Sequence, residues 1–520
     1  MKKVLLLLII FNFQFSIFSS VCAQDIYQVA ELSAVDLNGS ARYVGMGGAM
    51  GALGGDISLM SSNPAAIGLY RRGDASVTGS LVSQPGSKKW IDEKPSYASF
   101  DQAGFVYSMP FDGNSLRYFN LGFNYHKHHD FNQLMNNANV DLKGIGTPSQ
   151  TWQLADLCNY WGGADMATPL ANLAYDAYAV GFDDDTYTAY NASSLTYAKD
   201  RWGSNSAFDF NAAFNFNDKY YFGLTASVYS VKQKSYMYYS ENLLDVDGND
   251  DGSLGMQNSS KLTGTGFDMK LGFLARPIDG SNFKMGITLT TPSYYKLHYR
   301  NELDYATQTE SFGFKMPDGY YIRYDYNVRT PWRLGLSIGN TFFHRLALDA
   351  EYEFADYSCC AVSYDDEGWD DWDWEWRYTT KDRALNREID RHLKSTHTLK
   401  VGAELMINPM IYVRGGYNFV TPAFEKGAYL DQFINSASVD VASNTDYLNL
   451  SGINRYTAGV GFKIGNFYAD AAWLYQHQRG TLYAFDAALD ANAVPYVNAC
   501  PGKRISFNKS QVLLTLGLKF

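Results

Sequence analysis

The chain has 520 residues, with 43 Lys and Arg against 54 Asp and Glu, a net charge of −11, and 16% aromatic residues. Outside the first residues no basic cluster remains that could neutralise phosphates, which argues against nucleic acid as a partner. After residue 23 no stretch approaches the ~20 apolar residues of a transmembrane helix. Only a closed β-barrel could therefore carry this chain across a membrane.

The first 23 residues have the layout of a secretory signal peptide. Two lysines precede an almost wholly apolar run from Val4 to Phe18, and Ala23 closes the segment. We therefore expect residues 1–23 to be removed on export. Cys22 raises the alternative of a lipoprotein, but the residues before it lack the Leu and small-residue pattern that lipidation enzymes recognise.

The remaining cysteines, Cys158, Cys359, Cys360 and Cys500, lack the spacing of metal ligands. They might pair in an oxidising compartment, but the sequence leaves open which ones would do so. We expect no bound metal and no cofactor.

Period-two alternation is the dominant pattern along the rest of the chain. At its end, Val512, Leu514, Leu516, Leu518 and Phe520 would face one side of a strand, and mostly polar or small residues the other. A barrel strand shows its side chains to lipid and lumen in turn. The aromatic residue that closes this strand resembles the signal by which outer-membrane barrels are recognised for assembly.

Fourteen such segments can be counted, joined by six short turns and seven long loops that alternate. This order fits an even-stranded barrel with both ends in the periplasm. We predict an all-β fold, a 14-stranded antiparallel transmembrane β-barrel over residues 74–520, with its longest outer loop at 128–204. The predicted strands are 74–84, 100–109, 116–127, 205–216, 220–237, 261–275, 282–298, 321–338, 344–360, 395–407, 410–420, 454–464, 467–479 and 510–520.

Residues 24–73 do not alternate and are rich in glycine. About fifty residues cannot bury a core unaided. We therefore place this segment inside the barrel as an N-terminal luminal hatch, or plug, where glycine permits close backbone contact with the wall.

Two motifs in this segment carry a family resemblance. Residues 45–49 read Gly-Met-Gly-Gly-Ala and residues 63–65 read Asn-Pro-Ala, with Asp56 between them. Together they resemble the amino-terminal hatch of the FadL family of outer-membrane proteins, which includes the TodX-like transporters of aromatic hydrocarbons. Thr330–Gly335 and Leu399–Asn418 resemble that family's barrel strands.

The resemblance implies a monomeric barrel in the outer membrane of a Gram-negative bacterium, surrounded by lipid and lipopolysaccharide. It implies passive uptake of long-chain fatty acids or other hydrophobic compounds, which bind in a luminal pocket and leave sideways through the wall after the hatch moves. The alternative is a non-transporting member of the family that acts as a partner in protein secretion, like the PorV-like barrels. A general porin or a barrel enzyme is disfavoured by the plug and by the lack of a catalytic set in the sequence.

As hatch and gating residues we predict Gly45, Gly47, Gly48, Asn63, Pro64 and Ala65, mostly on the strength of the resemblance. Pro64 fixes one backbone dihedral, and the Asn63 side chain can satisfy backbone groups in the lumen. The alternative is that Asn-Pro is a turn and nothing more. No ligand-binding residue is predicted.

Four cations are predicted to face the lumen: Arg333, Lys400, Arg414 and Arg455. They could hold the carboxylate of a fatty acid. The favoured interpretation is that they pair with acids that also face inward and so brace the lumen. Those acids are Asp349, Glu351, Glu353, Glu404 and Asp470.

Two motifs suggest metal ions only weakly. His126, His128 and His129 cluster where a strand meets the longest loop, but without a partner acid they are more typical of a solvated loop edge than of a metal or haem site. Residues 247–252 match the first half of a calcium loop. The twelfth position is Asn258 rather than Glu, so the bidentate ligand is missing and an acidic turn is favoured.

Two further motifs are also given structural interpretations. Residues 365–376 combine seven acids with tryptophans at strand spacing and predict an extended or self-packed hairpin outside the membrane, although an apolar or cationic ligand is an alternative. Residues 335–339 match G-x-S-x-G. The serine lies within an alternating strand rather than at a turn into a helix, so no hydrolase site is expected.

Overall fold

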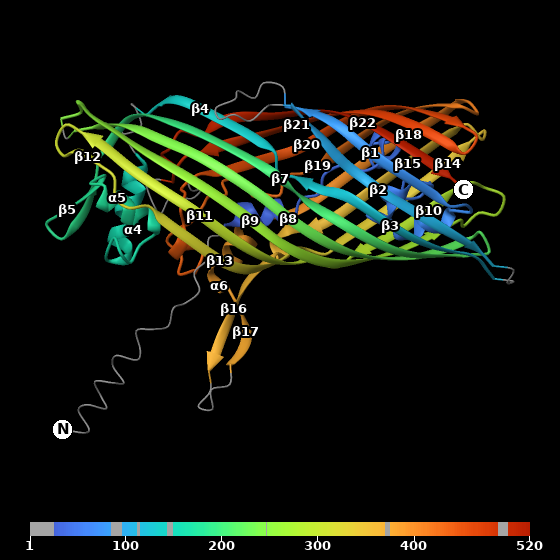
Figure 1. The fold of residues 1–520 in the computed structure, drawn as a ribbon, viewed down its shortest axis with the longest axis horizontal. Coiled ribbons are helices and arrows are strands. Elements are labelled where there is room, and N and C mark those ends of the chain that lie inside the picture. The colour runs from blue at the N-terminus through green and yellow to red at the C-terminus, as the bar shows by residue number, and fades with distance from the viewer. Residues whose placement is uncertain are drawn as a thin grey trace.

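The computed structural model describes residues 25–84, 96–111, 115–142, 149–245, 247–369, 375–486 and 498–520, so the predicted signal peptide lies outside the described residues. Its main feature is one large antiparallel sheet that closes on itself (Figure 1). The first strand, β1 (Asp74–Ser83), pairs on one side with β2 (Ser96–Pro110) and on the other with the last strand, β22 (Lys503–Lys519). Closure leaves no sheet edge at this seam.

The other strands of this sheet are given in chain order. They are β3 (Leu116–Asp130), β4 (Gln133–Asp141), β7 (Asn191–Phe216), β8 (Tyr220–Leu244), β9 (Asp250–Ala275), β10 (Lys284–Thr290), β11 (Tyr294–Thr309), β12 (Gly313–Lys315), β13 (Tyr320–Arg329), β14 (Arg333–Phe342), β15 (Leu346–Asp356), β16 (Ala361–Trp369), β17 (Glu375–Lys381), β18 (Ser395–Asn408), β19 (Ile411–Val420), β20 (Tyr447–Ile464) and β21 (Phe467–Tyr483).

Around the end of the barrel that carries the C-terminus, the ring has fourteen positions: β1, β2, β3, β7, β8, β9, β10, β14, β15, β18, β19, β20, β21 and β22. Each pairs antiparallel with both neighbours, which confirms the predicted 14-stranded antiparallel β-barrel.

Two neighbouring ring positions are interrupted where the sequence predicts unbroken strands. The predicted strand 282–298 is divided into β10 and β11 around Pro292, and 321–338 into β13 and β14 around Pro331. Proline has no backbone N–H to give to a ladder and is expected at an edge or a break. Each of the two predicted strands is therefore two separate strands, one on either side of its proline.

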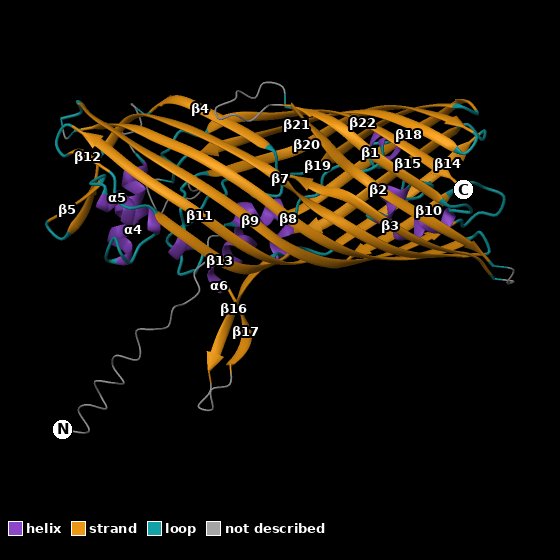
Figure 2. Ribbon diagram, viewed as in Figure 1, coloured by secondary structure: helices purple, strands orange, loops and turns teal. Residues whose placement is uncertain are grey.

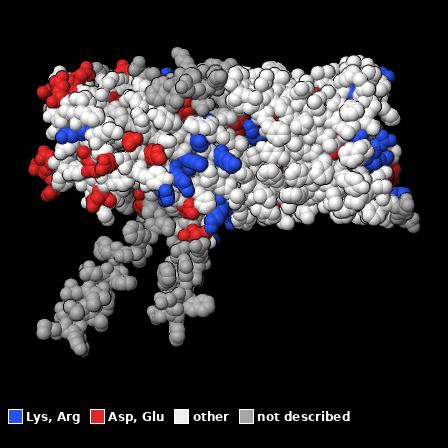
Figure 3. All heavy atoms as spheres, in the orientation of Figure 1, with Lys and Arg blue, Asp and Glu red and all other residues white. Residues whose placement is uncertain are grey.

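The outward faces of the strands form an apolar band around this end of the barrel. Leu271, Leu336, Phe462 and Leu516 are among the large apolar side chains exposed there. In Figure 3 this region is almost free of charged residues, whereas acidic residues gather at the opposite end. An uncharged, outward-facing apolar belt is the surface that a barrel presents to hydrocarbon. No helix among the described residues is long and apolar enough to cross a membrane.

Beyond the apolar band, the barrel wall extends further at its outer end, opposite the end that carries the C-terminus. The prediction of a long outer loop at residues 128–204 is wrong in part, because this range contains helices and strands (Figure 2). Its elements are β4, the first part of β7, helices α4 (Gln150–Trp161) and α5 (Pro169–Asp176), and a small separate sheet of β5 (Val180–Asp183) and β6 (Thr186–Ala189). Gly162, at φ +77°, ends α4, and the Thr168 side chain caps α5.

In the outer half the wall is not a continuous sheet. β15 ends at Asp356, β18 begins at Ser395 and β19 ends at Val420. The edge of β13 over residues 320–326 and the edge of β20 over residues 447–452 therefore extend outward with no barrel strand beside them. Non-strand segments fill the opening between them: α6 (Arg383–His392), η3 (Tyr357–Cys359), and residues 421–446 with η4 (Val439–Val441). This part of the wall is built from loops.

The N-terminal segment lies inside the barrel, where it forms four short helices. These are α2 (Ile26–Leu32), α3 (Ala41–Gly45), η1 (Ile57–Met60) and η2 (Pro64–Leu69). Most of their side chains are buried against inward-facing wall residues. We refer to residues 40–73 as the plug, since they fill the lumen at the height of the apolar band.

The placement of the apolar band predicts where a charge is tolerated on β9. Leu271→Arg puts a cation on the hydrocarbon-facing wall, and we expect the free energy of unfolding to fall by about 2–4 kcal/mol. Denaturant titration of the protein in phospholipid vesicles measures this. Gln257→Arg, an exposed position on the same strand outside the band, is the matched control and should change the stability by less than about 1 kcal/mol. Equal losses would contradict the placement.

Candidate functional site

The plug lies directly on the backbone of the wall at positions where the wall has glycine. A Cβ on Gly223 of β8 would lie 2.2 Å from the carbonyl carbon of Pro64, and one on Gly416 of β19 would lie 2.3 Å from the amide nitrogen of Gly47. Only a residue without a side chain permits such an approach. Plug and wall are therefore in van der Waals contact through main-chain atoms.

Two acids of β15 hold the plug by its backbone. The Glu351 carboxylate accepts hydrogen bonds from the N–H groups of Met50 (2.8 Å) and Gly51 (2.5 Å). Asp349 accepts from Ala52 (3.1 Å) and Leu53 (3.0 Å). Buried N–H groups need acceptors, and a carboxylate is a strong one. These four bonds fix the turn that follows the Gly-Met-Gly-Gly-Ala run.

All six predicted hatch residues are buried in the plug. Gly47 and Gly48 adopt φ of +66° and +77°, which favours glycine, and Gly45 approaches Gly459 on the wall. Their part in gating remains a prediction.

The Asn-Pro-Ala motif builds the turn into η2. The Asn63 side chain caps this helix through the N–H of Ala65 (3.2 Å) and donates to the Gly51 carbonyl (2.8 Å), while Pro64 occupies the first helical position. Asn63 thus ties the two motifs of the plug to each other. The motif does form a turn, as the alternative interpretation of Asn-Pro predicted, and its side-chain hydrogen bonds also brace the plug.

The predicted pairing of inward cations with inward acids is confirmed for three of the four cations. Arg333 contacts Glu353 at 2.8 Å and Lys400 contacts Glu351 at 3.3 Å. Arg414 bridges Glu404 (2.6 Å) and Asp470 (2.5 Å), and Arg42 of the plug also reaches Glu404 at 2.8 Å. Removing one partner of a buried ion pair strongly destabilises the folded protein, because the other charge is left buried without compensation.

Two members of this predicted set behave differently. Arg455 pairs with Asp36 of the N-terminal segment at 3.3 Å rather than with a wall acid. Asp349 binds plug N–H groups rather than a cation. Sequence reasoning missed both because the partners belong to the N-terminal segment, whose contacts with particular strands follow no local pattern.

Helix α2 crosses the lumen above the plug. It covers the opening in the wall between β13 and β20. Its apolar side chains pack with those of β13, α6 and the 421–446 segment in one core. The ring of Tyr27 stacks on Phe424 at 4.9 Å between centroids, and its hydroxyl donates to Asn449 at 2.9 Å. Tyr326 donates to Gln28 at 2.8 Å. The helix therefore links β13, β20 and the loops between them.

A cavity of about 340 Å³ lies between α2, the long strands and the 421–446 segment. Its lining mixes apolar and polar side chains. The apolar part includes Ile26, Phe131, Met237, Leu430, Ile434 and Leu450. Ligand pockets have volumes from about 300 to 1,000 Å³ and are largely apolar with a few fixed polar groups. This outer pocket is the candidate binding site.

Every Lys and Arg that lines the outer pocket is already paired with an acid, within the part of the chain that the structure describes. The pairs are Lys199 with Asp446 (2.7 Å), Arg201 with Glu31, Arg455 with Asp36 (3.3 Å) and Lys509 with Asp130 (3.0 Å). Asp25, Glu388 and Asp431 are further acids in the lining. The pocket therefore has an excess of acids and no free cation.

The titration of two acids outside the strands reflects this arrangement. Burial raises the pKa of Asp25, which the N–H of Gln28 offsets only in part. Burial would also raise the pKa of Asp446, but the Lys199 ammonium beside it brings that pKa below its ordinary value. Asp446 is therefore a carboxylate with a cationic partner, whereas burial leaves the pKa of Asp25 above its ordinary value.

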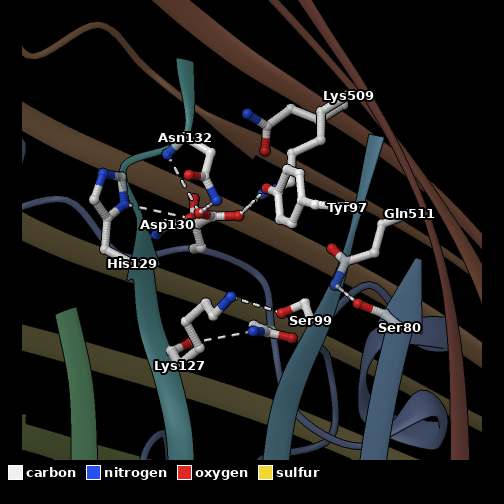
Figure 4. A network of polar contacts seen from close by, with 12 residues as sticks. Ser80, Tyr97, Ser99, Lys127, His129, Asp130, Asn132, Lys509 and Gln511 are labelled. Carbon is white, nitrogen blue, oxygen red and sulfur yellow. Dashed lines mark hydrogen bonds and ion pairs between the residues drawn. The ribbon is translucent and has the colours of Figure 1, made fainter. Parts of the chain in front are cut away.

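A polar network around Asp130 forms the side of the outer pocket next to β1, β2 and β22 (Figure 4). The Asp130 carboxylate accepts from the hydroxyl of Tyr97, the side-chain amide of Asn132 (2.7 Å) and Lys509, and its N–H donates to Asp36 (2.9 Å). Strands from both ends of the chain thus meet at one carboxylate.

The histidine cluster corrects an expectation. His126, His128 and His129 lie on β3 inside the barrel rather than at a solvated loop edge. His126 contacts Asp209 at 3.1 Å, His129 contacts Asp36 at 3.3 Å, and the ring of His128 packs edge-on against Tyr229. No metal-binding group of His, Cys, Asp and Glu occurs among the described residues.

The remaining motifs are structural. Residues 363–369 and 375–381 pair as the predicted hairpin, β16–β17, which projects from the flank of the barrel in Figure 1, and residues 370–374 lie outside the described part. Ser337 of the G-x-S-x-G match is in the middle of β14. Asp245 caps the acidic turn between β8 and β9. The four described cysteines are free thiols.

No protein-family model matches the chain, and no curated protein does. Solved structures are similar to it over nearly their whole length. They include the Ralstonia pickettii toluene transporter TbuX (13% identity, 93% of this chain and 99% of that one, TM-score 0.47) and a Pseudomonas aeruginosa FadL homologue (13%, 94% and 99%, 0.49). The monoaromatic hydrocarbon channel CymD is also similar (11%, 94% and 99%, 0.49).

The contact between Gly223 and Pro64 predicts that a single methyl group loosens the plug. In Gly223→Ala the new Cβ overlaps the Pro64 carbonyl, so we expect amide exchange of residues 57–70 to accelerate at least about tenfold. Gly255→Ala on β9, where a Cβ has open space, is the control and should leave exchange unchanged. Unchanged exchange in Gly223→Ala would show that the plug does not rest on this strand.

Proposed function

We propose that this protein is an outer-membrane transporter for the passive uptake of hydrophobic small molecules, which bind in the outer pocket above the plug. The observation that carries the proposal is the pocket itself: it is partly apolar, opens within the outer half of the barrel, and has a plugged lumen beneath it. An apolar pocket above a plug is not the interior expected of a water-filled pore. A hydrophobic cargo gains about 0.8 kcal/mol for each CH₂ group that leaves water.

The charges of the pocket favour a neutral cargo over a carboxylate. A fatty acid would need a cation, and each lining Lys or Arg already has a carboxylate partner. Adding an anion beside the further acids Asp25, Glu388 and Asp431, of which Glu388 contacts His392 at 3.0 Å, costs Coulomb energy. Hydrocarbons, alcohols or esters therefore suit the pocket better than long-chain fatty acids do.

Passage beyond the pocket requires a conformational change. The strands are hydrogen-bonded all round the ring at the height of the plug, and the plug rests on the wall backbone. We propose that the predicted gating residues, Gly45, Gly47, Gly48 and Asn63 to Ala65, form the part that shifts, and that the cargo then leaves sideways into the membrane. Release into lipid keeps the hydrophobic cargo out of water.

Binding of matched ligands tests the charge argument. With purified protein in detergent, we expect tritiated hexadecanol to bind with a Kd about 5–10-fold lower than palmitate at neutral pH, because only palmitate brings a charge. Leu430→Arg with Ile434→Arg, which adds charge to the pocket wall, should abolish binding of hexadecanol.

Ile278→Arg, at an exposed turn far from the pocket, is the control and should bind as the unchanged protein does. Tighter binding of palmitate would overturn the preference for neutral cargo. Absence of binding by both ligands and by toluene would overturn the transporter proposal and favour the role of a partner in secretion.

A further inference from the structure

A row of four cations crosses four neighbouring strands on the outer face of the barrel. Lys234 of β8 lies directly opposite Lys261 of β9, Lys261 opposite Arg300 of β11, and Arg300 opposite Arg323 of β13. All four side chains are exposed. Strands are about 4.8 Å apart, so the row is about 15 Å long. Lys232 and Lys296 lie next to it toward the apolar band, and we call these six residues the basic patch.

This arrangement is unfavourable for the protein alone. Like charges directly opposite each other on paired strands repel and destabilise the sheet. No member of the four-residue row forms an ion pair with an acid, within the described residues, whereas the inward cations Arg333, Lys400 and Arg414 are paired. Of the acids near the row, Asp325 contacts His298 at 2.7 Å, and Asp365 contacts Lys296, a member of the patch outside the row, at 2.9 Å.

The position of the patch indicates what would neutralise it. On β8, β9 and β11 the last large apolar residues that face outward are Val228, Phe267 and Tyr294, and the cations begin two to six residues further out. On β13, the exposed ring of Tyr321 lies beyond Arg323. In Figure 3 the basic patch lies just beside the uncharged band, on an outer half that is otherwise mostly acidic. A lipid whose acyl chains contact the band would place its headgroup on the patch.

We propose that the basic patch is a binding site for a phosphorylated glycolipid of the outer leaflet, with the phosphates held by the row Lys234, Lys261, Arg300 and Arg323. Arginine binds phosphate oxygens through two N–H groups at once, and lysine contributes a mobile positive charge. A row about 15 Å long can engage more than one phosphate of the same headgroup. Bound phosphates would remove the repulsion among the four cations.

The sequence gives no sign of this site. Its four residues are separated by 27, 39 and 23 positions, and no stretch of the chain is basic. The barrel's register alone brings them together. The expectation that no basic cluster could neutralise phosphates is therefore wrong for the folded protein, although the site faces lipid rather than nucleic acid.

Native mass spectrometry of the full mature protein with diphosphoryl lipid A tests the proposal. The variant Lys234→Gln, Lys261→Gln, Arg300→Gln and Arg323→Gln should bind at least about tenfold more weakly. The control removes four exposed cations elsewhere, Arg391→Gln, Lys426→Gln, Lys503→Gln and Arg504→Gln, and should stay within about twofold of the unchanged protein.

Heat-dependent migration on gels checks that both variants form closed barrels. Dephosphorylated lipid A should bind the unchanged protein as weakly as lipid A binds the row variant. Equal binding of both lipids, or equal binding by both variants, would overturn the site. Displacement of lipid A by inorganic phosphate alone at low millimolar concentration would show a free-anion site and overturn the assignment to a lipid.

Discussion

A backbone in hydrocarbon must satisfy every N–H and C=O within the protein, and this constraint determines the rest of the structure. The chain meets it with a ring of fourteen antiparallel strands that closes between β1 and β22. Closure leaves a lumen, and the N-terminal segment fills it. The segment has its own polar backbone, so the wall provides acceptors such as Asp349 and Glu351, and glycines where the two backbones meet.

Filling the lumen separates two environments. At the height of the apolar band the interior is a plug held by main-chain contacts and by the ion pair of Arg42 with Glu404. Above it, the strands β15, β18 and β19 end early, and loops with helix α2 replace the wall and enclose the outer pocket. Loops can rearrange at lower cost than a closed sheet. Under the proposed function, access to the pocket and retention by the plug would belong to different parts of the chain.

The sequence predicts the barrel well because strand alternation is local and repeats along the chain. It also indicates the plug through its glycines and the Asn63-Pro64-Ala65 motif. The breaks at Pro292 and Pro331 were missed, although the prolines themselves were a usable signal. The helices within 128–204 were missed too, because their apolar periodicity is weak and a long loop was already expected there.

Contacts between distant segments account for what the sequence could not show. The partner of Arg455 proved to be Asp36, and the His126 cluster proved to be luminal, because both depend on how the N-terminal segment and the strands align. The pairing of the pocket's cations and the row from Lys234 to Arg323 likewise follow from how strands far apart in the sequence align in the sheet. Such features are properties of the closed barrel rather than of any segment.

The central claim is that a hydrophobic cargo binds inside the barrel, above the plug. The most direct measurement is the anomalous diffraction of a crystal grown with a brominated alkylbenzene, which locates each bound bromine. The account predicts a bromine peak in the outer pocket, among Ile26, Met237 and Leu450. Peaks confined to the outer apolar band, with none in the lumen, would contradict it.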